Sequence, residues 1–368
     1  MNTDFNLFGA IGIRLVNPSE KNINSVSRLV GVNPSEIKGE PDITITFTDE
    51  IHSENLTYAG LDAGFDKNNF YIFKQNKKHS KVIIPFDKIG NSCKIICEKD
   101  IDDIPLLNYI IYLSFLSKRW IAVHSSSFVY NGEGILVMGW TKGGKTETLL
   151  SFLNNGAQFV SDEWTIISEN GKSLHGLPVT ICIWEWYFDD VKNILPKIKL
   201  QKKIIFRFIH FIQNIYKLAL KLNLHKSELL KILQRVVERS EKNLNIRVLP
   251  KNLVNVRIAE NTAALNKIIL SVSSQISEMT VKKISVQEVI ERMIHSNREE
   301  YNNLFVYYNA FRFAFPDRKN ELLEKFDEIH RKIFNYCFTG KNVYKIVHPY
   351  PVPINQLFTI VNKIFDQN

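Results

Sequence analysis

Cysteine is scarce in this sequence and is not arranged for metal binding. The 368 residues include four cysteines, and none of their spacings is typical of a zinc site. Cys93 and Cys97 are separated by two strand periods, which would place them on one face of a strand. We therefore expect unpaired, buried thiols in a reducing cytoplasm, and no metal role for Cys182 or Cys337.

Long apolar segments are missing as well. The first residues lack a basic region followed by an apolar stretch, so no signal peptide is expected. The segment Ile104–Leu116 is apolar enough for a buried helix but too short to span a bilayer. These absences predict a cytoplasmic protein without a transmembrane segment. The length predicts two domains, or one domain with a large insert.

A phosphate-binding pattern stands near the middle of the chain. Residues 139–146, GWTKGGKT, match the Walker A pattern G-x-x-x-x-G-K-[ST] at every defined position. The apolar run Ile135–Met138 predicts a buried strand before this P-loop, and Thr146–Leu153 predicts a helix that stops at Asn155-Gly156. The glycines can turn backbone N–H groups toward an anion, and the helix N-terminus adds partial positive charge.

Two side chains of this pattern have expected roles in nucleotide binding. Lys145, expected to be an exposed loop residue, should reach the β- and γ-phosphates of a nucleotide. The hydroxyl of Thr146 should bind Mg²⁺. Lys142 is unusual inside such a loop; it would add a phosphate contact or face the solvent.

Candidate acid–base residues flank the pattern on both sides. The run Ala157–Val160 predicts a strand that ends at Asp162 and Glu163, and two carboxylates there suit metal binding and general-base work. The run Ile121–Ser127 predicts an earlier strand that carries His124, with the turn Asn131-Gly132 after it.

This block resembles the HPr kinase/phosphorylase family and its wider HPr kinase-like relatives. Those proteins share a histidine-bearing strand, a hairpin, a loop ending in G-K-[ST]-E, and a strand that ends in paired acids. The matching residues here are His124, the segment Gly144–Glu147, and Asp162 with Glu163. The resemblance runs discontinuously from about residue 105 to 300. It implies an α/β fold with a P-loop kinase core of the HPr kinase/PEP carboxykinase-like type, and ATP and Mg²⁺ as cofactors.

The resemblance also implies site roles. Asp162 would accept the proton of the attacking hydroxyl, Glu163 would assist or bind the metal with Thr146 and Asp162, and His124 would orient the acids or share a proton. A packed strand histidine is an equally good interpretation of His124. The residues expected to contact the nucleotide are Gly139, Thr141, Lys142, Gly143, Gly144, Lys145, Thr146 and Glu147.

The sequence departs from the family pattern at two places. The family more often has aspartate at the position of Glu163, which weakens the role assigned to that residue. His175, and no arginine, stands near the phosphates by sequence order, so the residue that neutralises the transferred phosphoryl group is unassigned.

The basic charge of the chain is concentrated in one segment. Residues 191–245 hold 13 Lys and Arg against 3 Glu, a balance of +10, whereas the whole chain carries +9. Apolar residues recur there at helical spacing, and four lysines fall mostly off this stripe. The stripe consists of Phe208, Phe211, Ile215, Leu218 and Leu222, and the lysines are Lys217, Lys221, Lys226 and Lys231.

Three interpretations of this basic helical insert compete. In the first, the insert is a solvated element packed on the core or on a sister subunit of a homo-oligomer. In the second it is a docking surface for an acidic partner, and in the third it binds a membrane surface. No nucleic-acid motif accompanies the charge.

The rest of the chain supplies the domain boundaries. Residues 1–104 predict an N-terminal β-rich region, 105–190 the first part of the kinase core, 191–245 the insert, and 246–368 the second part of the core with a C-terminal helical and extended region. Expected elements include strands at Ile43–Phe47, Phe70–Phe73, Lys81–Ile84, Leu265–Val272 and Val343–Val347, strand character over Leu174–Trp184, a capping box at Ser285–Glu288, and helical periodicity over Asn320–Phe338. His348, after the last strand, is interpreted as a structural turn histidine.

Together these features predict a kinase that transfers the γ-phosphoryl group of ATP, with Mg²⁺, to a hydroxyl. The acceptor is open: a serine of a protein or peptide, or a small hydroxylated molecule. The alternative is a nucleotide-binding regulatory or scaffold protein that uses the P-loop as a switch without phosphoryl transfer.

Overall fold

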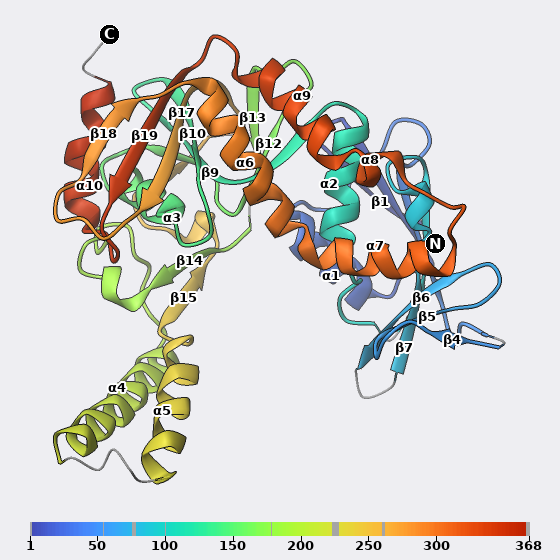
Figure 1. The fold of residues 1–368 in the computed structure, drawn as a ribbon, viewed down its shortest axis with the longest axis horizontal. Helices are drawn as coiled ribbons and strands as arrows, with labels where there is room; N and C mark the ends of the chain where they lie inside the picture. Colours follow the sequence, from blue (N-terminus) through green and yellow to red (C-terminus); the bar gives the residue numbers. More distant parts are fainter. Residues whose placement is uncertain are drawn as a thin grey trace.

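The structure is a computed structural model that describes residues 2–53, 55–75, 79–99, 101–177, 179–222, 228–259 and 262–365. These residues form a mixed α/β protein, as the sequence predicts. Two large sheets lie at opposite ends of the body, and a helical hairpin projects from the end that holds the second sheet (Figure 1). In the described ranges no helix is both long and apolar enough to cross a membrane.

The N-terminal sheet has eight strands in the order β1-β2-β3-β8-β7-β6-β5-β4. Strands β2 (Ile11–Val16) and β3 (Ile43–Thr48) bury every second residue, the period expected for a sheet with one face on a core. The other elements are β1 (Asn2–Leu7), α1 (Glu20–Val30), β4 (Thr57–Tyr58), β5 (Ala63–Phe65), β6 (Phe70–Gln75), β7 (His79–Ile83) and β8 (Cys93–Glu98). The expected β-rich character and the buried thiols of Cys93 and Cys97 are confirmed.

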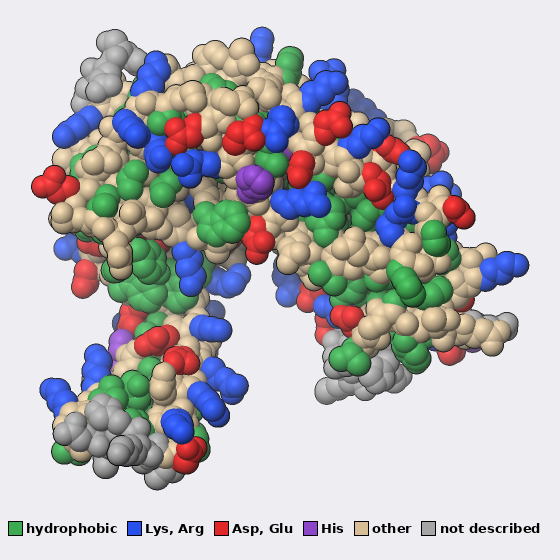
Figure 2. Space-filling view, in the orientation of Figure 1, with side chains coloured by type: hydrophobic (Ala, Val, Ile, Leu, Met, Phe, Trp, Pro, Cys, Tyr) green, Lys and Arg blue, Asp and Glu red, His purple; other side chains and the backbone are tan. Residues whose placement is uncertain are grey.

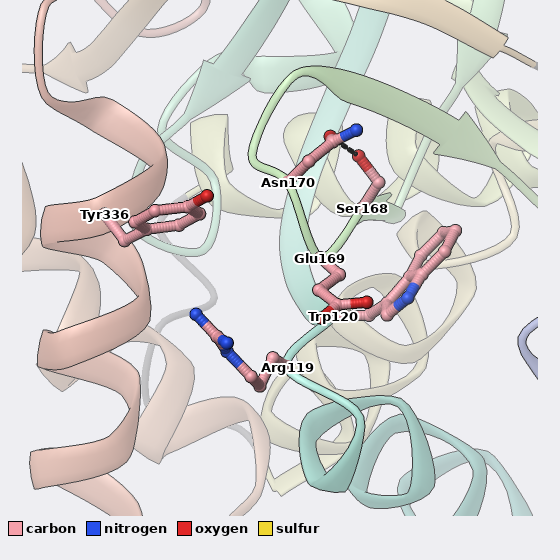
Figure 3. A pocket seen from close by; sticks show the side chains of 6 residues that line it. All are labelled: Arg119, Trp120, Ser168, Glu169, Asn170 and Tyr336. Carbon is pink, nitrogen blue, oxygen red and sulfur yellow. Dashed lines mark hydrogen bonds between the residues drawn. The ribbon is translucent and has the colours of Figure 1, made fainter.

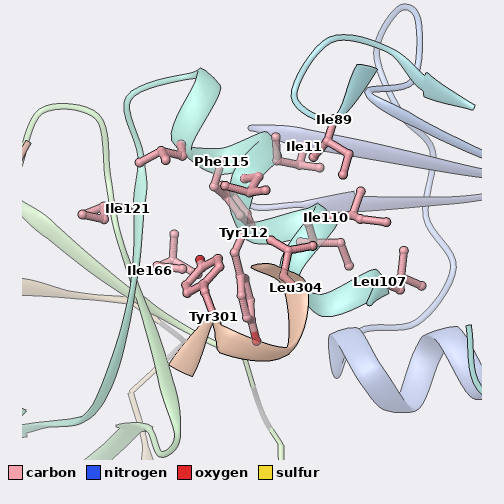
Figure 4. Packing of buried hydrophobic residues seen from close by; sticks show 14 of the residues in the cluster. Ile11, Ile89, Leu107, Ile110, Tyr112, Phe115, Ile121, Ile166, Tyr301 and Leu304 are labelled. Carbon is pink, nitrogen blue, oxygen red and sulfur yellow. The ribbon is translucent and has the colours of Figure 1, made fainter. Parts of the chain in front are cut away.

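Helix α2 (Leu107–Ser117) joins the two sheets. It is buried on almost every side, as its uniformly apolar sequence predicts. On one side Leu107 and Ile110 lie among side chains of the N-terminal region, and on the other Tyr112 lies beside Tyr301 (Figure 4). The ring of Tyr112 also stacks on Trp164, with centroids 4.5 Å apart. One hydrophobic core is therefore shared by both regions.

The second sheet carries the candidate site. Its strand order is β16-β11-β9-β12-β13-β17-β19-β18, and β10 (Glu133–Met138) pairs with β9 (Ile121–Tyr130) and, in parallel, with β17 (Thr262–Ser273). The other strands are β11 (Gln158–Ser161), β12 (Trp164–Ile167), β13 (Ser173–Gly176), β16 (Arg257–Ile258), β18 (Thr280–Lys283) and β19 (Asn342–His348).

Strand β10 is buried on both faces. Leu136 and Met138 belong to the core shared with α2, whereas Ile135 and Val137 belong to a second core that includes helix α3 (Lys145–Leu153). This is why the sequence of β10 is a continuous apolar run and not an alternating one. The strand is thereby fixed firmly at the point where it enters the loop 139–146.

Helices of the C-terminal third cover both regions. Helix α6 (Val286–Glu300) contacts β9, and α10 (Ile354–Val361) contacts α3. Helix α7 (Asn302–Ala314) reaches the N-terminal sheet, where Phe311 packs edge-on against Phe70 with centroids 5.9 Å apart. The remaining helices are α8 (Glu321–Glu324), α9 (Phe326–Phe338) and the short η1 (Phe86–Lys88), η2 (Glu185–Tyr187), η3 (Pro250–Asn252) and η4 (Asn362–Ile364).

The basic insert is an antiparallel helical hairpin on a two-stranded base. Strands β14 (Ile181–Trp184) and β15 (Asn245–Val248) form the base, and α4 (Leu200–Lys221) and α5 (Glu228–Glu241) project from it (Figure 1). Helix α4 buries Phe206 and Ile209. Its predicted apolar stripe faces outward, with Phe208 61% and Phe211 60% exposed. Lys226 lies outside the described residues. Lys and Arg side chains lie along both edges of the hairpin (Figure 2).

Two local expectations need correction. The expected strand region 174–184 is two strands in different sheets, β13 and β14, and Pro178 between them lies outside the described residues. Ser285 caps α6 by accepting from the Glu288 N–H, but the Glu288 carboxylate accepts from Lys345, 2.9 Å away, instead of returning to the cap. Helix α10 follows the proline-rich segment after β19, in the C-terminal region for which the sequence predicts helical and extended structure.

Candidate active site

The loop 139–146, called the glycine loop below, connects β10 to α3 and lies tightly against two other strands. Gly144 has φ +90°, and a Cβ atom there would come within 2.3 Å of His348 Nε2. A Cβ atom on Gly139 would lie 2.3 Å from the Ser271 carbonyl oxygen. Both glycines are needed because the ends of β17 and β19 leave no room for a side chain.

Lys145 is not the exposed side chain that the sequence suggested. Only 8% of the residue is exposed, and its Nζ atom donates to the carbonyl oxygens of Gly139 (3.2 Å) and Trp140 (3.0 Å). Burial lowers the pKa of Lys145, and the nearby carboxylates of Glu300, Glu163 and Asp162 act against this shift. The ammonium group of Lys145 therefore bonds to the backbone of its own loop. An anion bound in the loop would replace the two carbonyl oxygens as the partner of this ammonium group.

Thr146 and Asp162 lie side by side at the start of α3 and the end of β11. The hydroxyl of Thr146 is 3.1 Å from Oδ1 and 3.3 Å from Oδ2 of Asp162. Asp162 is 1% exposed, and this burial, with the adjacent charge of Glu163, raises its pKa to about 7. A carboxyl group with this pKa can both take up and release a proton at neutral pH.

His124 lies between two carboxylates. Its Nε2 atom is 3.2 Å from Glu163 Oε2, and its Nδ1 atom is 2.6 Å from Glu300 Oε1, an ionic contact that is not aligned as a hydrogen bond. Burial opposes protonation of His124, but the two acids outweigh it, and the pKa of His124 is raised. The hydrogen bond from His124 in turn lowers the pKa of Glu163.

Glu300 is a site residue that the sequence analysis missed. It is the last residue of α6, and its carboxylate also accepts from the hydroxyl of Thr141 in the glycine loop, at 3.0 Å. Burial raises the pKa of Glu300. The contacts with His124 and Thr141 and the charge of Lys145 lower it by a larger amount, so the net shift is downward. No motif marks this residue, because it lies far along the chain in an ordinary amphipathic helix.

His348, at the end of β19, packs directly against the glycine loop. It is fully buried at the end of β19, and its Nε2 atom lies 3.0 Å from the Gly143 carbonyl oxygen and 3.1 Å from Ser271 Oγ. Its role is structural, as expected, but the structure it supports is the loop itself and not a surface turn.

His175 does not approach the glycine loop. Its ring lies 4.9 Å from the ring of Phe8 and 5.1 Å from that of Trp120, between the two sheets. Burial lowers the pKa of His175. The expectation that this residue stands near the phosphates is therefore wrong. Lys145 and His124 are basic side chains that adjoin the acids of the site.

Glu147 follows in the first turn of α3, and Lys142 has a left-handed backbone with φ +61°. The side chain of Lys142 lines a cleft of about 1090 Å³ that extends toward the hairpin. A separate hollow of about 260 Å³ lies at the start of β9, beside Arg119 and Tyr336 (Figure 3). No residue of the glycine loop or of the acidic cluster lines this smaller hollow.

Two oxygen donors of the site suit a magnesium ion that is held mainly by a nucleotide. No group of three or more His, Cys, Asp or Glu side chains in the described part of the chain is arranged to hold a metal. Magnesium bound to a nucleotide needs only one or two protein oxygens besides phosphate and water. The Thr146 hydroxyl and the Asp162 carboxylate, which are in direct contact, provide such a pair.

Comparison with known proteins gives one distant similarity. The chain is 26% identical over 129 residues to a protein named HPr kinase/phosphorylase from Mycoplasmopsis pulmonis (strain UAB CTIP). The match covers 35% of this chain and 38% of that protein, so it spans well under half of either. No family model matches the chain. These findings support a distant, kinase-like relationship.

Proposed function

We propose that this protein is an ATP- and Mg²⁺-dependent kinase that transfers the γ-phosphoryl group to a hydroxyl. The observation that carries the proposal is the contact between Thr146 and Asp162 at the N-terminus of α3. At the N-terminus of α3 this contact joins the Thr146 hydroxyl, which would bind Mg²⁺, to a buried carboxyl near the loop lysine. This supports phosphoryl transfer, because that reaction depends on positioning and on compensation of the phosphate charge.

The glycine loop supplies the triphosphate site in this proposal. Backbone N–H groups from Gly143 to Thr146 and the Lys145 ammonium would hold the phosphates, and Thr146 with Asp162 would hold the metal. A bound magnesium ion neutralises charge on the phosphate oxygens. Glu163 contributes mainly through His124, because its carboxylate already accepts from that ring.

Asp162 is the proposed general base. The acceptor oxygen attacks the γ-phosphorus, the bond from that phosphorus to the β,γ-bridging oxygen breaks, ADP leaves, and the hydroxyl proton passes to Asp162. In the metal-free protein the pKa of Asp162 is about 7, and Mg²⁺ beside the carboxyl would lower it, so that Asp162 would be ionised and able to take the proton at neutral pH. Glu163 is less suited to take the proton, because its pKa is lowered by His124.

The proposed kinase core comprises residues 105–190 and 246–368, and the insert 191–245 is proposed to recognise the acceptor or a partner. The acceptor is a serine of a protein or peptide, or a small hydroxylated molecule. HPr, which the name of the similar protein contains, is the first acceptor to try.

ADP formation from Mg-ATP, measured with HPr, with serine peptides and with water as acceptors, tests the proposal. The expected result is Mg²⁺-dependent turnover that Asp162→Asn removes. If the wild type binds ATP tightly but shows no more turnover than Asp162→Asn with every acceptor, the protein is a nucleotide-dependent switch and the kinase proposal fails.

A further inference from the structure

The cleft beside the glycine loop has no role in the chemistry described above. It extends from Lys142 to the base of the helical hairpin, where His210 of α4 lines it. The acids Asp162, Glu163 and Glu300 are not among the side chains that line it within the described residues. The glycine loop therefore borders two different environments: the acidic cluster next to Thr141 and Thr146, and the cleft next to Lys142.

Aromatic rings form much of the wall of this cleft. Trp184 and Trp186 stack on each other with centroids 4.7 Å apart and an angle of 10° between their planes. Trp186 is 46% exposed and Tyr350, which also lines the cleft, is 52% exposed. Apolar side chains also gather on the surface where the hairpin joins the body (Figure 2). Large aromatic faces left open in a cleft are suited to a planar, apolar ligand group.

The acids that line the cleft are already paired within the protein, Glu238 with the Gln234 side-chain amide at 2.9 Å. Glu185 lies 2.8 Å from Nε2 of His210, and Glu241 accepts from the Gln213 side-chain amide at 3.0 Å. These pairs leave the aromatic faces and the ammonium groups of Lys142 and Lys242, which also lines the cleft, as groups available to a ligand. The backbone of Lys142 is held in place, because its carbonyl oxygen accepts from Ser273 Oγ at 3.1 Å.

The two ends of a bound nucleotide have different requirements. The phosphoryl group that is transferred must face Asp162, so the nucleoside end must leave the glycine loop away from the acids. We propose that the aromatic cleft binds the nucleoside of the phosphate donor, with the base against Trp186 and Tyr350 and Lys142 near the ribose and the adjoining phosphate. This inference rests on the proposed function, since it assumes a nucleotide in the glycine loop.

The inference is tested by comparing ATP and ADP with inorganic tripolyphosphate, which has the phosphates but no nucleoside. Calorimetric titrations are made with wild type, Trp186→Ala and Tyr350→Ala. Each substitution should weaken ATP and ADP binding on the order of tenfold, the usual effect of losing one base-stacking ring, and leave tripolyphosphate binding unchanged. Lys145→Ala should weaken the binding of all three compounds.

Two control variants complete the design. Tyr336→Ala removes a comparably exposed tyrosine, 56% exposed, from the smaller hollow and should change nothing (Figure 3). Tyr350→Phe keeps the ring and should keep ATP affinity. If Trp186→Ala does not fold, as thermal unfolding would show, the comparison of Tyr350→Ala with Tyr350→Phe decides alone.

Each other outcome overturns the inference in a recognisable way. Unchanged ATP affinity in both alanine variants excludes a base on these rings, and loss of transfer to an acceptor in the same variants assigns the cleft to the acceptor. An equal loss for tripolyphosphate means that the substitutions disturb the loop. If the wild type binds neither ATP nor tripolyphosphate, the proposed function itself fails, and the inference with it.

Discussion

The Glu300 carboxylate lies 2.6 Å from Nδ1 of His124, although the two residues are on elements far apart in the chain. The same carboxylate accepts from Thr141, so one side chain links α6, β9 and the glycine loop. His124 is thereby held in an orientation that presents its other nitrogen to Glu163. Glu300 is best described as a positioning residue for this cluster.

Replacing Glu300 with glutamine should slow transfer on the order of tenfold, a typical effect of removing an outer partner of a catalytic group. ATP affinity should not change, because Glu300 does not form the phosphate site. The pKa of His124 should fall, since one of the two carboxylates that raise it is lost. Turnover, ATP titration and an NMR titration of the histidine check these points. Glu299→Gln, at the exposed neighbouring acid of α6, is the control. A Glu300→Gln protein with normal turnover and an unshifted histidine would contradict the assignment.

Asp162→Asn should keep ATP binding and reduce transfer by a factor on the order of 10² or more, the usual contribution of a positioned general base. The substitution keeps the size of the side chain but removes its ability to accept a proton. Glu163→Gln should have a smaller effect. If Asp162→Asn turns over near the wild-type rate and Glu163→Gln or His124→Asn does not, the base is within the His124–Glu163 pair.

Lys145→Ala should abolish transfer and weaken ATP binding, because a charge that holds the phosphates is lost. In the free protein it also removes two hydrogen bonds to the carbonyl oxygens of Gly139 and Trp140. Some loss of thermal stability without nucleotide is therefore expected, in contrast to what an exposed lysine would give. Calorimetry with ATP and a melting curve without it separate the two effects. Unchanged ATP affinity would mean that the glycine loop is not the nucleotide site.

The sequence was informative where structure and pattern are local. The strand before the glycine loop, the loop glycines and the strand that ends at Asp162 could be predicted because each depends on a short run of residues. Glu300 could not be predicted, since its place beside His124 depends on how α6 crosses β9. His175 was placed wrongly for the same reason: order along the chain did not reveal that its strand pairs it away from the loop. The amphipathic pattern of α4 was visible, but not that its apolar side faces outward.

The neighbouring acids Asp162 and Glu163 should affect the pH dependence of stability in opposite ways. The pKa of Asp162 is raised from 3.8 to about 7, so the folded protein binds more protons than the unfolded one between these values, and stability is lost as pH rises through this window. Without nucleotide and with EDTA, Asp162→Asn should therefore gain stability over the wild type from about pH 4 to pH 8, by at most about 4 kcal/mol.

The pKa of Glu163 is lowered from 4.5, so its contribution is present above that value and is lost as pH falls through the folded pKa. Glu163→Gln should therefore be less stable than the wild type at pH 7, and the difference should shrink as the pH falls below 4.5. Urea unfolding at several pH values measures both variants. A stability difference for Asp162→Asn that does not vary with pH would show that Asp162 is ionised in the folded protein throughout the range.

The last prediction concerns the helical hairpin. Helix α4 carries five Lys and Arg residues and no acid, and its apolar stripe is exposed, so it presents an apolar, positively charged surface. We expect this surface to recognise an acidic partner or acceptor without taking part in catalysis. Reversing Lys217, Lys221 and Lys231 to glutamate should raise the acceptor KM or abolish partner pull-down, and leave slow ATP hydrolysis unchanged. Lys226 can be added to the set.

The charge contribution should also weaken with salt, because the Debye length shrinks from roughly 10 Å at 0.1 M to roughly 3 Å at 1 M. Reversal of Lys67, Lys94 and Lys172, which are exposed outside the hairpin, is the matched control and should have no effect on the acceptor KM. Phe208→Ser with Phe211→Ser tests the apolar part of the same surface. Loss of ATP hydrolysis in the charge-reversed hairpin would place the segment in the catalytic core. Wild-type behaviour with every acceptor and partner would mean that the hairpin is a solvated insert, because a surface used for recognition cannot tolerate a reversal of its charge.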